Sequence, residues 1–256
     1  MPTKHLSFTG STGESLAASV DLPDGHIRAW ALFGHCFTCN RQVRGASRTC
    51  KALAKQGIAA FRFDFTGLGE SGGDFGETTF LTNVNDLIAA YEFMDSHPEL
   101  QAPSLLVGHS LGGAAVLRAG QDMPKAKAVA TIGAPFDPAH SILRIAEDIS
   151  TVDQYGTQNL NIGGREVPIS REFLEVLAET NPESYVGKLR KPLLILHSPT
   201  DQVVGIDNAQ KIFQVARYPK SLMSLDRADH LLTRAKSASR AADLIRVWAE
   251  EYLPFD

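Results

Sequence analysis

Residues 104–117 read Ser-Leu-Leu-Val-Gly-His-Ser-Leu-Gly-Gly-Ala-Ala-Val-Leu, which places a serine between an apolar run and a helical run. A strand, a sharp turn and a helix around a G-x-S-x-G pattern are typical of a nucleophile elbow. Small residues at Gly108 and Gly112 leave room for the turn, which lifts the serine hydroxyl out of the sheet. The pattern therefore predicts Ser110 as a nucleophile, with the N–H of Leu111 aimed at the reacting atom.

A serine hydroxyl needs a base to take its proton, and the base that follows it in this arrangement is a histidine. His230 lies in the loop between the expected last strand and last helix. His140 stands at the start of an insertion and His197 lies inside a buried run, so neither is well placed. We expect His230 to be the base.

The base is oriented by a carboxylate that fixes its tautomer without taking the proton. Asp201 follows the apolar run Leu193–His197, and Asp137, which follows the preceding run, is the alternative. Asp226 and Asp229 stand so close to His230 along the chain that we expect them to shape its loop. The order of residues favours Asp201 as the acid.

A second N–H group is needed to stabilise the oxyanion of an acyl-transfer intermediate. The loop after Ala29–Gly34 reads His-Cys-Phe-Thr-Cys-Asn from residue 35 to residue 40. We expect Phe37 in this loop to supply that N–H, alongside Leu111.

Apolar runs alternate with helical-period segments along the chain, and this alternation predicts parallel strands joined by crossover helices. The expected strands are Leu6–Thr9, Leu16–Asp21, Ala29–Gly34, Ile58–Asp64, Ser104–His109, Ala128–Ile132, Leu193–His197 and Ser221–Leu225. The expected helices are Val43–Gln56, Thr79–Ser96, Ser110–Gln121, Ile206–Ala216 and Ala235–Tyr252.

Residues 136–188 interrupt the alternation, because no buried strand is expected there. We expect a helix over Ser141–Ile149, a hairpin that turns at Gly163-Gly164, and a helix over Arg171–Glu179. An insertion after a core strand is expected to form a cap over the carboxyl edge of the sheet, where ligands bind in open α/β sheets. Its apolar residues predict a mostly apolar pocket: Ile142, Leu143, Ile145, Leu160, Phe173 and Leu177.

Composition restricts the class of partner. The 256 residues carry a net charge of −4, which gives no electrostatic reason to expect nucleic acid or an anionic membrane. No secretory signal or membrane-spanning run is visible, so we expect a cytoplasmic protein. The chain is expected to bind a small neutral molecule, and its oligomeric state, monomer or homodimer, stays open.

Three cysteines, Cys36, Cys39 and Cys50, are an odd number that argues against a disulfide scaffold. Cys36 and Cys39 form a C-x-x-C pair, a spacing that can be a redox pair but here lacks further zinc ligands. We expect two reduced thiols that fill space in the loop.

Residues 63–71, Phe-Asp-Phe-Thr-Gly-Leu-Gly-Glu-Ser, together with Ser110, Asp201 and His230, resemble the α/β-hydrolase superfamily along nearly the whole chain. Within it, the chain resembles small cinnamoyl or feruloyl esterases and the serine-aminopeptidase-like lysophospholipases. The resemblance implies a single domain over residues 1–256, with a mostly parallel eight-stranded sheet flanked by helices and an inserted cap. Those families carry glycines where this chain has Cys36 and Cys39. The cysteine version resembles a bacterial group often fused to an OsmC-like peroxide-reducing domain, and whether this chain belongs to such a fusion stays open.

These features predict a serine hydrolase, first a carboxylesterase that cleaves small or medium acyl esters through an acyl-enzyme on Ser110. Neither a metal nor an organic cofactor is implied. The same residues would serve a peptidase, an amidase or a thioesterase. The alternative from another class is a non-catalytic module that partners an OsmC-like redox domain.

Overall fold

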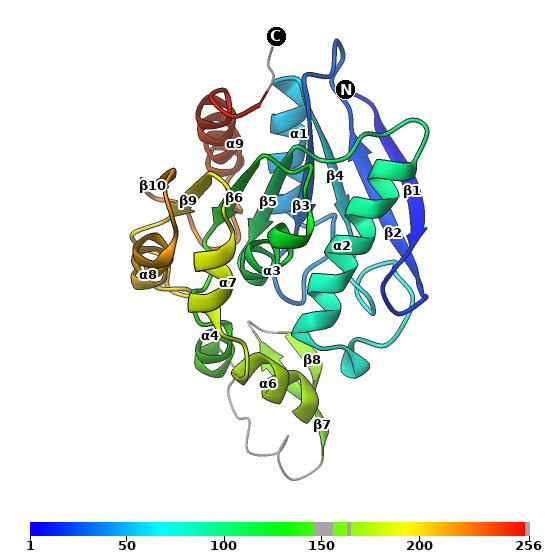
Figure 1. Cartoon of the computed structure of the whole chain (residues 1–256). Coiled ribbons are helices and arrows are strands. Elements are labelled where there is room, and N and C mark those ends of the chain that lie inside the picture. Colours follow the sequence, from blue (N-terminus) through cyan, green and yellow to red (C-terminus); the bar gives the residue numbers. More distant parts are fainter. Residues whose placement is uncertain (146–155, 163–164, 254–256) are drawn as a thin grey trace.

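Eight strands form the central sheet of the computed structural model, which describes residues 1–145, 156–162 and 165–253 (Figure 1). They are β1 (Thr3–Thr9), β2 (Ser15–Asp21), β3 (Ala29–Gly34), β4 (Ile58–Phe63), β5 (Leu105–His109), β6 (Ala128–Ile132), β9 (Leu193–His197) and β10 (Lys220–Ser224). Their order across the sheet is β1-β2-β4-β3-β5-β6-β9-β10. The pairs β1–β2 and β2–β4 are antiparallel, and the remaining pairs are parallel.

The central strands β3, β4, β5, β6 and β9 are buried at every residue. Burial on both faces explains why they read as continuous apolar runs, as parallel sheets covered by helices do. The expected mostly parallel eight-stranded sheet is confirmed, with strand ends that differ from the predicted ones by a few residues at most.

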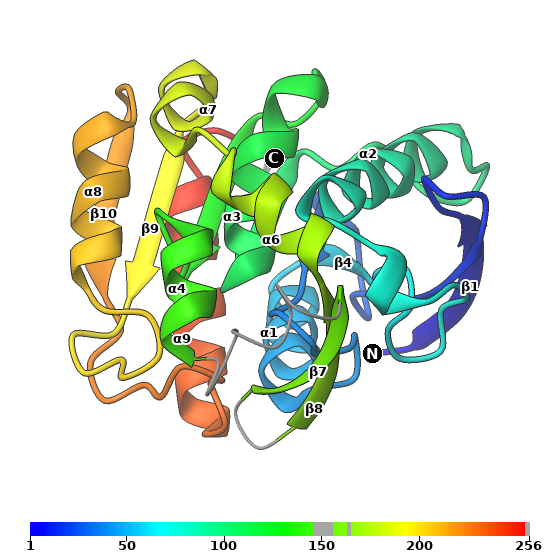
Figure 2. The ribbon, with the colours of Figure 1, turned by 90° about the horizontal axis from the view of Figure 1, so that it is seen from below.

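Helices cover both faces of the sheet (Figures 1 and 2). Helices α1 (Arg44–Lys55) and α9 (Ala235–Ala249) pack together on one face. The other face carries α2 (Phe80–Ser96), α3 (Leu111–Ala119) and α8 (Asp207–Val215). Two short 3₁₀ turns, η1 (Phe75–Glu77) and η2 (Gly120–Asp122), complete this part. In the part of the chain that the structure describes, no helix has the length and apolar character needed to cross a membrane.

The segment between β6 and β9 holds α4 (Pro138–Ile145), the antiparallel pair β7 (Thr157–Ile162) and β8 (Arg165–Ser170), α6 (Arg171–Ala178) and α7 (Pro182–Lys188). Figure 1 shows β7, β8 and α6 together at one end of the molecule. The expected helix over Ser141–Ile149 is described only as far as residue 145, and the expected turn at Gly163-Gly164 lies outside the described residues.

Helix α7 was not among the expected elements. It begins after Asn181, whose side chain accepts a hydrogen bond from the Ser184 N–H, and Pro182 occupies its first position. Both are ordinary helix-start signals. The sequence therefore carried the signal for α7.

Candidate active site

Ser110 sits at the junction of β5 and α3 with φ of 55° and ψ of −127°. Its N–H donates to the carbonyl of Ile132 on the neighbouring strand at 2.9 Å, which ties the turn to the sheet. A Cβ at Gly108 would lie 2.4 Å from the Gly112 carbonyl oxygen, and one at Gly112 would lie 2.3 Å from the His35 carbonyl oxygen. Glycine is required at both positions because helix α3 begins so close to β3 and β5.

Three predicted side chains converge at the carboxyl edge of the sheet. The Ser110 Oγ lies 2.9 Å from His230 Nε2, and His230 Nδ1 lies 2.8 Å from Asp201 Oδ2. All three residues are largely buried, with Ser110 and Asp201 each 8% exposed. The line of contacts allows a proton to pass from the hydroxyl to the imidazole while the carboxylate holds the ring.

The Asp201 carboxylate is held in its ionised form. Burial alone would raise its pKa, but hydrogen bonds from His230 and from the N–H groups of Val203 and Val204 bring the pKa below its ordinary value. An ionised partner at Nδ1 fixes the imidazole tautomer that leaves Nε2 able to accept a proton.

The other aspartates have different partners. Asp137 is exposed, and its carboxylate accepts a hydrogen bond from the His140 N–H at the start of α4. Asp226 accepts a hydrogen bond from the Ser224 hydroxyl, and Asp229 binds the N–H and hydroxyl of Thr233. Among the aspartates weighed from the sequence, Asp201 is the one that contacts His230.

His109, which directly precedes Ser110, supports the loop of His230. Its Nε2 donates to the His230 carbonyl at 2.6 Å, and the two rings lie 5.3 Å apart. Burial, reinforced by the nearby His230 ring, lowers the pKa of His109 to about 3. The side chain is therefore neutral at neutral pH.

The N–H groups of Phe37 and Leu111 are the predicted oxyanion donors. Leu111 is the first residue of α3, where helix N–H groups have no partner within the helix. Among the described residues, neither N–H donates a hydrogen bond. Both are free to bind an oxygen, while Leu111 also benefits from the positive end of the α3 dipole.

The two loop cysteines differ from the expectation. Cys36 and Cys39 form a disulfide, with Cα atoms 5.3 Å apart, so the prediction of two reduced thiols was wrong. The reason is a tight turn, in which the Cys39 N–H donates to the Cys36 carbonyl at 3.2 Å and Thr38 adopts φ of 56°. Cys50 is free and buried in α1.

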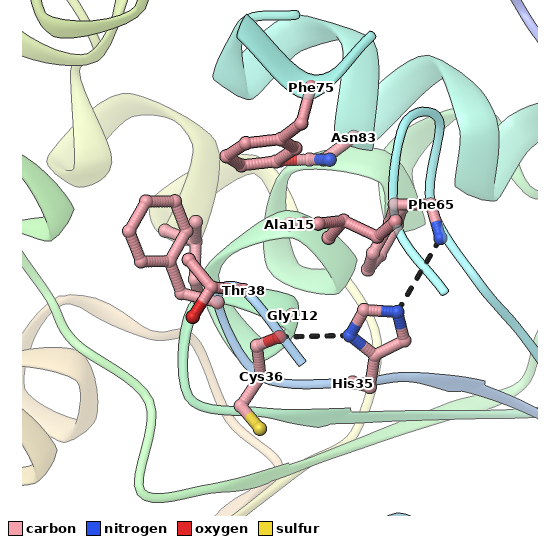
Figure 3. Close-up of a pocket in the computed structure, with 11 residues that line it drawn as sticks. His35, Cys36, Thr38, Phe65, Phe75, Asn83, Gly112 and Ala115 are labelled. Atoms are coloured by element: carbon pink, nitrogen blue, oxygen red, sulfur yellow. Dashed lines mark hydrogen bonds between the residues drawn. The ribbon is translucent and has the colours of Figure 1, made fainter. Parts of the chain in front are cut away.

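A small pocket, whose lining includes Phe37 and Leu111, lies at this site (Figure 3). Most of its lining is apolar: Phe37, Phe65, Leu68, Phe75, Leu111 and Ala115. Among the polar lining residues, Asn83 is 4% exposed, and its side chain makes no hydrogen bond within the described residues. Figure 3 shows its amide beside the Phe75 ring.

The segment between β6 and β9 contacts the oxyanion loop. Phe173 on α6 lies 5.5 Å from the Phe37 ring and 6.1 Å from the Phe75 ring, measured between ring centroids. Ile142, Leu160 and Leu177 from the same segment are also buried in this core. The side chains of Leu143 and Ile145 lie outside what the structure describes.

Gly133 belongs to the site, although sequence reasoning did not select it. It follows β6 with φ of 56°, and a Cβ there would lie 3.4 Å from Asp201 Oδ2 and 3.5 Å from His230 Nδ1. The sequence feature that could have identified Gly133 is a glycine directly after a buried strand, at the sheet edge where the other site residues lie.

Comparisons with known proteins support the fold. The family described as "Serine aminopeptidase, S33" matches residues 39–151. The esterase domain of a Rhodothermus marinus protein is 44% identical, with 98% of this chain and 99% of that domain covered and a TM-score of 0.80. Est1E from Butyrivibrio proteoclasticus, solved with ferulic acid, is 19% identical over 94% of this chain and 98% of that one, with a TM-score of 0.80, and shows the fold alone.

The chain belongs to the α/β-hydrolase superfamily. Within it, the chain resembles esterases. It is also 29% identical over 182 residues to the uncharacterised protein YfhR of Salmonella typhi, covering 70% of this chain. The chain spans a little over half, 57%, of that relative's length.

Proposed function

We propose that this protein is a serine carboxylesterase in which Ser110 is the nucleophile, His230 the general base and Asp201 the acid that orients it. The observation that carries the proposal is the pair of contacts from Ser110 Oγ to His230 Nε2 and from His230 Nδ1 to Asp201 Oδ2. The 44% identical esterase domain from Rhodothermus marinus supports an ester as the substrate.

In the proposed reaction, Ser110 Oγ attacks the ester carbonyl while His230 Nε2 takes its proton. The tetrahedral oxyanion accepts hydrogen bonds from the Phe37 and Leu111 N–H groups. The alcohol then leaves with the proton from His230, and water hydrolyses the acyl-enzyme by the same steps. Asp201 stabilises the imidazolium and remains unprotonated throughout.

The pocket favours a small acyl group. The space inside it that is open to the centre of a water-sized sphere is about 10 Å³, roughly enough for one water molecule, and apolar side chains form most of its wall. We propose that the acyl part of the ester occupies this pocket and that residues 136–188 act as a cap through Phe173. The ring contacts of Phe173 with Phe37 and Phe75 support this arrangement.

A panel of substrates tests the proposal. We expect p-nitrophenyl acetate and butyrate to be hydrolysed with a higher kcat/KM than p-nitrophenyl decanoate or dodecanoate. Turnover of aminoacyl p-nitroanilides with no turnover of esters would instead favour a peptidase. The description of the matching family as a serine aminopeptidase suggests this alternative. No turnover of any ester, amide or thioester would favour a non-catalytic module.

A further inference from the structure

The Phe37 N–H belongs to the same peptide unit as the Cys36 carbonyl. Because a peptide unit is planar and trans, the direction of its C=O determines the direction of its N–H. Whatever holds the Cys36 carbonyl therefore also aims the N–H that the proposed function assigns to the oxyanion.

The Cys36 carbonyl oxygen accepts two hydrogen bonds. His35 Nδ1 donates at 2.8 Å, and the Cys39 N–H donates at 3.2 Å (Figure 3 shows the first). His35 Nε2 accepts in turn from the Phe65 N–H at 3.4 Å, so the ring is neutral with its proton on Nδ1. Burial also lowers the pKa of His35, which favours the neutral ring.

Both ends of the loop are anchored outside it. His35 follows β3 directly, and Arg41 forms a buried ion pair with Asp64, which follows β4. Between these anchors, Thr38 holds a left-handed conformation that is unfavourable for a β-branched residue. The Cys36–Cys39 disulfide spans this turn between the two anchors.

We propose that the Cys36–Cys39 disulfide is a positioning element of the oxyanion hole, which keeps the Phe37 N–H aimed at the reacting carbonyl oxygen. This inference rests on the proposed function. The two sulfurs bracket the donor, and both cysteines are buried, at 3% and 7% exposed. Without the bond, the Cys39 N–H loses its fixed place against the Cys36 carbonyl, and the His35 hydrogen bond alone then orients the peptide that carries the donor.

The test compares Cys36→Ser, Cys39→Ser and the double variant with wild type, and uses Cys50→Ala as the matched control because Cys50 is a buried free thiol outside this loop. A full oxyanion donor typically contributes roughly 10²–10³ in kcat. We expect each loop variant to lose about ten- to a hundredfold in kcat, with KM nearly unchanged. The double variant should lose no more than either single one, because all three lack the same bond.

A second readout separates positioning from a general structural role. A trifluoromethyl ketone forms a tetrahedral oxyanion adduct with an active-site serine, so its Ki should rise in the loop variants by about the factor by which kcat/KM falls. Circular dichroism should show all variants folded at the assay temperature. In guanidinium without reductant, iodoacetamide should alkylate wild type once, at Cys50.

Three alkylations of fully active wild type would overturn the proposal. So would wild-type kcat and Ki in the loop variants, or losses in the double variant that equal the product of the single losses. Failure of the proposed function is recognised separately, because Ser110→Ala would then hydrolyse esters as wild type does.

Discussion

Replacing His109 by Gln probes the neutral histidine that supports the His230 loop. The Nε2 of His109 donates to the His230 carbonyl, and the ring is 1% exposed. A glutamine amide can donate a hydrogen bond to the same carbonyl but cannot titrate. The substitution should therefore remove a proton-binding group and, because the hydrogen bond is replaced, cost less than about 1 kcal/mol at pH 7.5, the usual value of one lost hydrogen bond.

The magnitude follows from the pKa of His109. It is lowered to about 3 in the folded protein, while a histidine in the unfolded chain titrates near 6.5. Below about pH 6.5, the unfolded chain takes up a proton that the folded protein refuses. The contribution of neutral His109 to the free energy of unfolding is therefore fully present above that pH. It is lost as the pH drops toward 3, by about 1.4 kcal/mol per pH unit. Over the whole window, this amounts to on the order of 5 kcal/mol.

Urea unfolding between pH 4.5 and pH 7.5 measures this effect. His35 and His197, whose pKa values burial also lowers, give wild type further slope of the same sign. In His109→Gln, the slope of unfolding free energy against pH between 4.5 and 6 should be smaller by about 1.4 kcal/mol per pH unit. His26→Gln, at an exposed position, should keep the wild-type slope. Equal slopes in wild type and His109→Gln would refute the reasoning.

Three further tests use substitutions in and around the site. Asp201→Asn should lower kcat by roughly 10⁴-fold through loss of the correct imidazole tautomer, whereas Asp137→Asn should keep most activity, and the reverse order in an ester assay would contradict the assignment. Gly112→Ala should abolish turnover and lower the Tm, because its Cβ would meet backbone oxygens of residues 34 and 35, so an active, stable variant would be unexpected. Phe75→Leu should raise kcat/KM for hexanoate relative to acetate by roughly tenfold, about the value of one methylene in a pocket, and an unchanged ratio would exclude this pocket as the acyl site.

The strands and the core helices could be predicted from the sequence because burial on both faces of the sheet leaves an uninterrupted apolar signal. Every residue of β5 and β9 is buried, for example. The serine turn could be located for a related reason, since the close approach of α3 to β3 excludes any side chain at Gly112. This steric exclusion leaves glycines beside the serine, so the turn is visible in the sequence although the contact joins distant residues.

The features that could not be predicted depend on the path of the backbone in space, which no local sequence pattern shows. The Cys36–Cys39 bond occurs in a turn where Thr38 is left-handed, a conformation that its side chain disfavours, so the spacing alone gave no sign of it. The order of residues favoured Asp201 over Asp137, but both loops follow neighbouring strands of the sheet, so the distance from each carboxylate to His230 could not be predicted. The hydrogen bond from His109 to the His230 carbonyl joins residues 121 positions apart, and no local pattern announces it.

The central claim, that Ser110 is an activated nucleophile, is tested most directly by covalent labelling. A fluorophosphonate probe incubated with the folded protein should add one adduct by intact mass, and peptide mapping should locate it on Ser110. Ser110→Ala should fold normally, take no label and retain a residual acceleration of only about 10³–10⁴ over water. Labelling at another residue, or ester hydrolysis by Ser110→Ala at the wild-type rate, would contradict the account.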